Sequence, residues 1–165
     1  MKATINVNGE THHVEISPAT SLCDVIRETV GLTGVKKGCD SGGCGMCTVL
    51  MDDLPVLSCI MPCWKAEGKK VLTVEGLAKK GELSNLQESF IRNLAPQCGY
   101  CTPAMLLVAK ALLNSNPNPS EDQVRFALCG VLCRCTGYAP YIHAIMDAAS
   151  DSQPKAMRMA EFADS

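Results

Sequence analysis

The residues most capable of chemistry in this sequence are its cysteines, which number 11 among 165 residues. Four of them share one segment, with four, two and eleven residues between successive thiols: Cys39, Cys44, Cys47 and Cys59. A C-x4-C-x2-C run with a more distant fourth cysteine is the plant-type ligand pattern of a [2Fe–2S] cluster. The spacing therefore predicts an iron–sulfur site built from four thiolates in this segment.

The residues between these cysteines support the same interpretation. A backbone that wraps an inorganic core needs positive φ angles and no Cβ in the way, and glycine allows both. Structural zinc, the main alternative, usually takes C-x2–4-C pairs and needs no glycine-rich wrap. A disulfide or a chance spacing is the other alternative. The cluster is favoured because four glycines stand among the thiols: Gly38, Gly42, Gly43 and Gly45.

A second group of cysteines lies further along the chain in two close pairs, Cys98 with Cys101 and Cys133 with Cys135. Both pairs fall between expected helices, so antiparallel packing would bring them to one end of a bundle. Two such pairs can also build a tetrahedral zinc site, so zinc remains an alternative here. Ligand softness favours the cluster. Cys129, one helical turn before Cys133, stays open as a ligand on spacing alone.

Composition and charge argue against several other classes of protein. A net charge of -2 and 4% aromatic residues leave neither a basic face nor stacking platforms for nucleic acid. Residues 1–16 lack the apolar core and cleavage site of a signal peptide, and no apolar run is long enough to span a membrane. Metal ligation in a reducing cytoplasm then explains the cysteines better than a secreted disulfide framework. We therefore expect a cytoplasmic location.

The first cysteine group is expected to lie in a small sheet domain. Asn8-Gly9 is a strong signal for a two-residue hairpin turn. A helix is predicted from Thr20 or Ser21 to about Val30. Alternating apolar and polar side chains predict strands at residues 2–7, 11–16, 48–51, 54–57 and 71–74. These elements predict a β-grasp, ferredoxin-like domain over residues 1–76.

Beyond this domain the pattern changes from strands to helices. Residues 77–82 are interpreted as a linker, and residues 83–149 as a four-helix domain, which makes the fold class α+β. Ser120 begins a segment that fits a capping box. Residues 150–165 show no apolar period and are expected to be a tail, either disordered or packed on a partner through Met157, Met159 and Phe162. The helices are predicted at residues 85–94, 103–113, 120–129 and 138–149.

Four motifs occur in order along the chain: GCDSGGCGMCTVL at 38–50, LSC at 57–59, QCGYCTP at 97–103 and CRCTGY at 133–138. Together, over about residues 2–149, they resemble the iron–sulfur subunit of the xanthine oxidase family of molybdenum hydroxylases. The resemblance implies that the second cysteine group also binds a [2Fe–2S] cluster. It implies eight iron ligands, namely Cys39, Cys44, Cys47, Cys59, Cys98, Cys101, Cys133 and Cys135, and no ligand role for Cys23, Cys63 or Cys129.

The same resemblance implies an electron-transfer subunit without catalytic residues of its own. It implies that Gln97 hydrogen-bonds a molybdopterin and that Cys135 approaches the pterin amino group, while the first domain faces FAD. The chain has no Rossmann-type glycine fingerprint and is too short to hold those cofactors. They are expected on a large molybdopterin-binding and a medium FAD-binding subunit, in a heterotrimer or its dimer. A free-standing electron carrier and a zinc-stapled interaction module are the alternatives.

Overall fold

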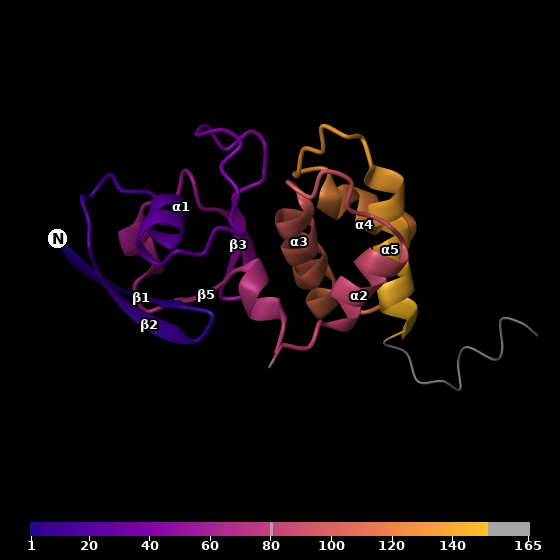
Figure 1. The fold of residues 1–165 in the computed structure, drawn as a ribbon, viewed down its shortest axis with the longest axis horizontal. Coiled ribbons are helices and arrows are strands. Elements are labelled where there is room, and N and C mark those ends of the chain that lie inside the picture. The colour runs from indigo at the N-terminus through magenta and orange to yellow at the C-terminus, as the bar shows by residue number, and fades with distance from the viewer. Residues whose placement is uncertain (80, 152–165) are drawn as a thin grey trace, which may run out of the picture.

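The computed structural model describes residues 1–79 and 81–151, which form a sheet domain followed by a bundle of helices (Figure 1). Five strands make one mixed sheet in the order β2-β1-β5-β3-β4. Strand β1 pairs antiparallel with β2 and parallel with β5, and β3 pairs antiparallel with both β4 and β5. The strands are β1 (Lys2–Val7), β2 (Glu10–Glu15), β3 (Thr48–Met51), β4 (Leu54–Leu57) and β5 (Lys70–Leu72). The predicted α+β class, with a ferredoxin-like domain before a helical one, is confirmed.

Both hairpins of the sheet close through two residues with positive φ. The φ angles are 55° and 89° at Asn8 and Gly9, and 49° and 66° at Asp52 and Asp53. Two-residue turns of this kind match the right-handed twist of the strands that they connect. The hairpin predicted from Asn8-Gly9 is therefore confirmed.

The helix before the cysteine loop differs from the expected regular helix. It begins as α1 (Leu22–Asp24) and widens into a π-helical segment, η1 (Val25–Thr29). Ser21 is the N-cap, since its hydroxyl accepts a hydrogen bond from the N–H of Asp24 at 3.1 Å. The Val30 N–H donates to the carbonyl five residues back, that of Val25, at 2.9 Å. No local pattern signals this wider turn.

The last strand ends earlier than the sequence predicted. Strand β5 stops at Leu72, and a 3-10 turn, η3 (Val74–Leu77), follows it. The cause lies at Thr73, whose N–H donates to the Asn8 Oδ1 at 2.9 Å while its hydroxyl accepts from the Asn8 Nδ2, also at 2.9 Å. Side-chain hydrogen bonds replace the strand ladder at this position. The prediction of strand through residue 74 was wrong for this reason.

Four helices form the second part of the chain, and all four were predicted, although their ends are shifted. Both α2 and α4 begin with a capping box, formed by Ser84 with Gln87 and by Ser120 with Gln123. The capping box predicted at Ser120 is thus confirmed, and the one at Ser84 was missed. The helices are α2 (Asn85–Arg92), α3 (Thr102–Ser115), α4 (Glu121–Leu128) and α5 (Tyr138–Asp151).

Helix α5 continues into the segment that was expected to be a tail. Its last residue, Asp151, forms an ion pair with Arg92 of α2. Met157, Met159 and Phe162 lie outside the described residues. Within the described part of the chain, no helix has the length and apolar character needed to cross a bilayer.

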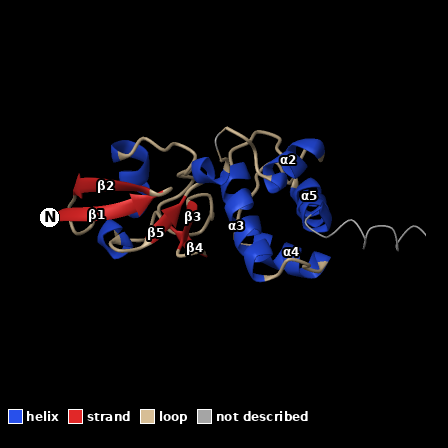
Figure 2. Cartoon of the chain, turned by 90° about the horizontal axis from the view of Figure 1, so that it is seen from below, coloured by secondary structure: helices blue, strands red, loops and turns tan. Residues whose placement is uncertain are grey.

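Two apolar cores lie in the two parts, and strand β3 contributes to both. Successive strand residues point to opposite faces of a sheet. Val49 accordingly belongs to the core beneath β1 and β2, whereas Leu50 packs among the helices with Met105 and Leu107 of α3. Helix α3 is the helix that lies along this side of the sheet (Figure 2). The two domains are therefore packed directly against each other.

Candidate metal centres

The first cysteine group consists of Cys39, Cys44, Cys47 and Cys59, and the structure brings all four thiols together. The thiols of Cys39 and Cys44 lie within hydrogen-bond reach of each other. Cys47 and Cys59 form a second pair, and the N–H of Cys59 donates to the Cys47 Sγ at 3.4 Å. Cys59 is also close enough to Cys39 for their charges to interact. Residues from the loop before β3 and from the end of β4 thus meet at one place.

Backbone N–H groups point at the sulfurs of this group. The N–H of Ser41, helped by the neighbouring Cys44, lowers the pKa of the Cys39 thiol to about 6. Burial, with the Cys47 thiol beside it, raises the pKa of Cys59 to about 11, against the effect of the Gly42 N–H. Hydrogen bonds donated to the sulfur favour the charged thiolate form, whereas burial without a counter-charge disfavours that form. A metal ion would supply the missing positive charge, so the group fits an iron ligand set.

The second cysteine group consists of Cys98, Cys101, Cys133 and Cys135. It forms where the α2–α3 loop meets the α4–α5 loop at one end of the bundle (Figure 1). Cys98 pairs with Cys135, and Cys101 pairs with Cys133. The N–H of Tyr100 is the main cause that lowers the pKa of Cys98, and burial raises that of Cys101 to about 11. The convergence expected from two antiparallel helix pairs is observed.

Within each group the thiols are arranged in pairs rather than around one point. Among residues 1–79 and 81–151, no three Cys, His, Asp or Glu side chains surround a single metal-ion position. Tetrahedral zinc needs three or four protein ligands around one ion. A [2Fe–2S] cluster spreads four cysteine ligands over two irons. The paired arrangement therefore fits the two-iron cluster.

The three remaining cysteines have different surroundings. Cys23 and Cys63 are fully buried in the core of the sheet domain, and burial raises the pKa of both thiols. A buried neutral thiol packs like a small apolar side chain. Cys129 is exposed at the C-cap of α4.

The two cysteine groups approach each other across the contact between the domains. The N–H of Leu132, next to Cys133, donates to the carbonyl of Cys44 at 2.9 Å. Gly45 has a φ of 71°, and a Cβ there would lie 2.0 Å from the carbonyl oxygen of Gly130. Only glycine fits at this position. The sequence predicted that Gly45 wraps a cluster but did not indicate its contact with the helical domain.

Gln97, predicted to bind a pterin, lies beside the second group on the protein surface. Its side chain is exposed, as is the neighbouring Cys98, and Cys135 is half-buried. The Gln97 amide rests on Gly137, where a Cβ would lie 2.8 Å from the Gln97 Nε2. Gly137 thus leaves the space that this amide occupies. The sequence did not indicate this role, although Gly137 is part of the CRCTGY motif.

Comparison with known proteins agrees with this geometry. A family model described as "2Fe-2S iron-sulfur cluster binding domain" matches residues 5–73, and another, described as "[2Fe-2S] binding domain", matches residues 73–146. The nicotinate dehydrogenase small FeS subunit of Eubacterium barkeri is 47% identical over 140 residues, which are 85% of this chain and 88% of that protein. The chain belongs to the iron–sulfur subunits of the molybdenum hydroxylase family.

Other members of this family have a similar sequence identity to this chain. The nicotine 6-hydroxylase small subunit of Paenarthrobacter nicotinovorans is 44% identical over 144 residues, 87% of each chain. The crystal structure of quinoline 2-oxidoreductase from Pseudomonas putida 86 matches with a TM-score of 0.88 and 46% identity, over 92% of this chain and 94% of that one. The predicted family is therefore confirmed. The subunit carries two [2Fe–2S] clusters and transfers electrons within an oxidoreductase complex.

Proposed function

We propose that each cysteine group of the iron–sulfur subunit holds one [2Fe–2S] cluster, and that electrons pass through both between a molybdopterin and FAD on partner subunits. The observation that carries this assignment is the pairing of the thiols in each group. A [2Fe–2S] cluster supplies a one-electron carrier when it is bound. The proposed ligands are Cys39, Cys44, Cys47 and Cys59 for one cluster, and Cys98, Cys101, Cys133 and Cys135 for the other.

The chain's own residues set the surroundings of each carrier. Hydrogen bonds to ligand sulfurs and the degree of solvent exposure tune the reduction potential of such centres. The N–H groups of Ser41, Met46 and Gly42 donate to sulfurs of the first group, which favours added negative charge there. The N–H of Tyr100 does the same for Cys98 in the second group. Tuning of the two carriers is the subunit's contribution to the reaction.

We place the molybdopterin beside Gln97 and Cys135, and FAD beside the first domain. Cys98 and Gln97 are exposed, so a partner can reach this end of the bundle. An amide both donates and accepts hydrogen bonds, which suits a pterin edge that offers both kinds of group. Pro96 restricts the backbone before Gln97, and the Gln97 side chain packs against Gly137. A preorganised polar group of this kind is a common way to orient a bound cofactor.

The partner subunits follow from the same placement. We propose a large molybdopterin-binding subunit and a medium FAD-binding subunit, assembled as a heterotrimer or its dimer in the cytoplasm. The words "small FeS subunit" in the name of the Eubacterium barkeri relative support larger partners. Within this chain, we assign residues 1–76 to the FAD side, 77–82 to the linker and 83–149 to the molybdopterin side.

The substitution Gln97→Ala in the assembled complex tests this placement. Leaving one polar pterin group unpaired should cost about 1–3 kcal/mol, so we expect weaker retention of molybdenum and slower reduction of the clusters by substrate. Both [2Fe–2S] signals should persist in electron paramagnetic resonance (EPR) spectra. The matched control is Asn114→Ala, which removes an exposed amide near the opposite end of α3. Full molybdenum content together with wild-type turnover in Gln97→Ala would contradict the pterin contact.

A further inference from the structure

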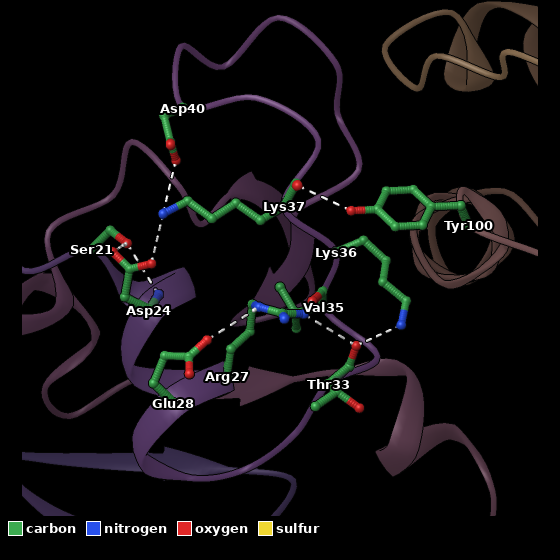
Figure 3. A network of polar contacts seen from close by, with 10 residues as sticks. All are labelled: Ser21, Asp24, Arg27, Glu28, Thr33, Val35, Lys36, Lys37, Asp40 and Tyr100. Atoms are coloured by element: carbon green, nitrogen blue, oxygen red, sulfur yellow. Dashed lines mark hydrogen bonds and ion pairs between the residues drawn. The ribbon is translucent and has the colours of Figure 1, made fainter.

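Tyr100 connects the two cysteine groups across the domain boundary (Figure 3). It stands between Cys98 and Cys101 in the α2–α3 loop. Its hydroxyl donates a hydrogen bond to the carbonyl of Lys37 at 3.0 Å. Lys37 lies two residues before Cys39, the first cysteine of the first group. One side chain from the second group therefore reaches the backbone of the first.

The carbonyl that Tyr100 contacts belongs to Lys37, whose side chain forms two ion pairs within the sheet domain. The Lys37 ammonium lies 2.9 Å from the carboxylate of Asp24 and 3.1 Å from that of Asp40. Asp24 also accepts a hydrogen bond from the Ser21 hydroxyl at 2.7 Å, which ties this network to the start of α1. Figure 3 shows the Lys37 side chain directed at the two carboxylates while its carbonyl faces Tyr100. Tyr100 is thus connected, through the backbone of Lys37, to a polar network that reaches the start of α1.

A second hydrogen bond attaches the same cysteine loop elsewhere. The N–H of Leu132 donates to the carbonyl of Cys44, and it comes from the other loop of the second group. Together with the packing of α3 against β3, these two points of attachment fix the orientation of one domain on the other as well as the distance between them. Electron transfer between fixed carriers falls steeply as their separation grows, so small shifts in this contact would matter for function. Support of this kind by neighbouring residues is what holds a functional site in its productive geometry.

We propose that Tyr100 is a positioning residue whose hydroxyl fixes the separation and relative orientation of the two clusters. This role is separate from holding either cluster, because the Tyr100 hydroxyl contacts the sheet domain rather than a ligand sulfur. Tyr100 donates to Cys98 through its backbone N–H, which any residue other than proline keeps at this position. The substitution Tyr100→Phe therefore removes the bridge while the ring and the N–H remain. The inference rests on the proposed ligand sets only where cluster spectra are used to test it.

The first measurement compares hydrogen–deuterium exchange of the Leu132 amide in the full wild-type chain and in Tyr100→Phe. Loss of one of two cooperating hydrogen bonds should raise the population with open domains, and with it Leu132 exchange, about fivefold. Exchange within α3 and α5 should stay unchanged. This readout requires no cluster assignment, so it tests the bridge even where the proposed ligand sets fail.

The second measurement is the EPR splitting that arises when both clusters are reduced, because this splitting depends on their separation and orientation. We expect it to broaden or change in Tyr100→Phe while the iron content stays at the wild-type level. The matched control is Tyr141→Phe, which removes a hydroxyl that contacts Thr102 and Cys101 inside the helical domain only. It should alter the second cluster's own signal and leave the splitting unchanged. Wild-type exchange at Leu132 and unchanged splitting in Tyr100→Phe, or loss of iron in that variant, would overturn the proposal.

Discussion

The two cysteine groups bring four thiols together in different ways. The first takes its thiols from one stretch of chain, Cys39–Cys59, whereas the second takes them from two loops that α3 and α4 separate. Exposure differs too, since Cys44, Cys47 and Cys59 are buried but Cys98 is exposed. A ligand set built from one segment depends on local backbone conformation, and one built from two loops depends on helix packing. The second group therefore combines access to a partner with greater dependence on the rest of the fold.

The largest expected effect comes from removing one ligand in each group. Cys44→Ser should abolish the EPR signal of the first cluster and leave the second, and Cys101→Ser should do the reverse. The reason is that the two groups share no thiol and lie in different domains. Iron content should fall to about half in each variant, because each domain is expected to bind one cluster of two irons. Loss of both signals from a single substitution would contradict this independence by showing that the groups form only together.

A smaller but still large effect is expected from Gly45→Ala. The new Cβ would clash with the Gly130 carbonyl, and the positive φ alone costs about 1–2 kcal/mol for a residue other than glycine. We expect a lower melting temperature and faster exchange at the Leu132 amide, with helix content unchanged. Gly130→Ala is the matched control, since a Cβ there meets no atom within 4 Å. Equal stability of the two variants would show that this contact does not hold the domains together.

The smallest effect is expected from weakening one helix cap in each domain. Ser120→Ala removes the N-cap of α4 and should destabilise the helical domain by about 1 kcal/mol. Iron should then leave the second group faster than in the wild type, while release from the first group is unchanged. Ser21→Ala, which removes the N-cap of α1, is the mirror variant for the sheet domain. Iron-release kinetics followed by the loss of visible absorption measure both, and equal acceleration at both groups would contradict the distinction.

The sequence predicted the first cysteine group more completely than the second, because the separation of the ligands along the chain differs between them. The spacing and glycines around Cys44 indicate a cluster because its ligands are neighbours in sequence. For the second group, spacing left zinc and Cys129 open, and only the resemblance and then the observed thiol pairs favoured four particular cysteines. Strand and helix periodicity predicted most elements correctly, including β3 and β4 with their observed ends.

Apart from the π-helical segment η1 and the capping box at Ser84, the features that the sequence did not predict are contacts between distant residues. The end of β5 depends on Asn8, far away in the chain, and the bridge from Tyr100 ends on a backbone carbonyl. At Gly45 and Gly137 the sequence shows that there is no side chain, but the neighbouring residues do not indicate which distant group occupies the space. Such contacts follow from how the domains pack, and periodicity within a single element carries no information about them.

The shared strand β3 has a consequence for the order in which the molecule can form during synthesis. Leu50 has an exposed fraction of 0%, yet it belongs to the same core as Met105 and Leu107, which are translated much later. Until α3 has left the ribosome, the nascent sheet domain presents this side of β3 to solvent. Exposed apolar surface and unfinished sheets favour aggregation of nascent chains. The N-terminal half is therefore expected to need the C-terminal half, or a chaperone in its place, before it becomes a stable domain.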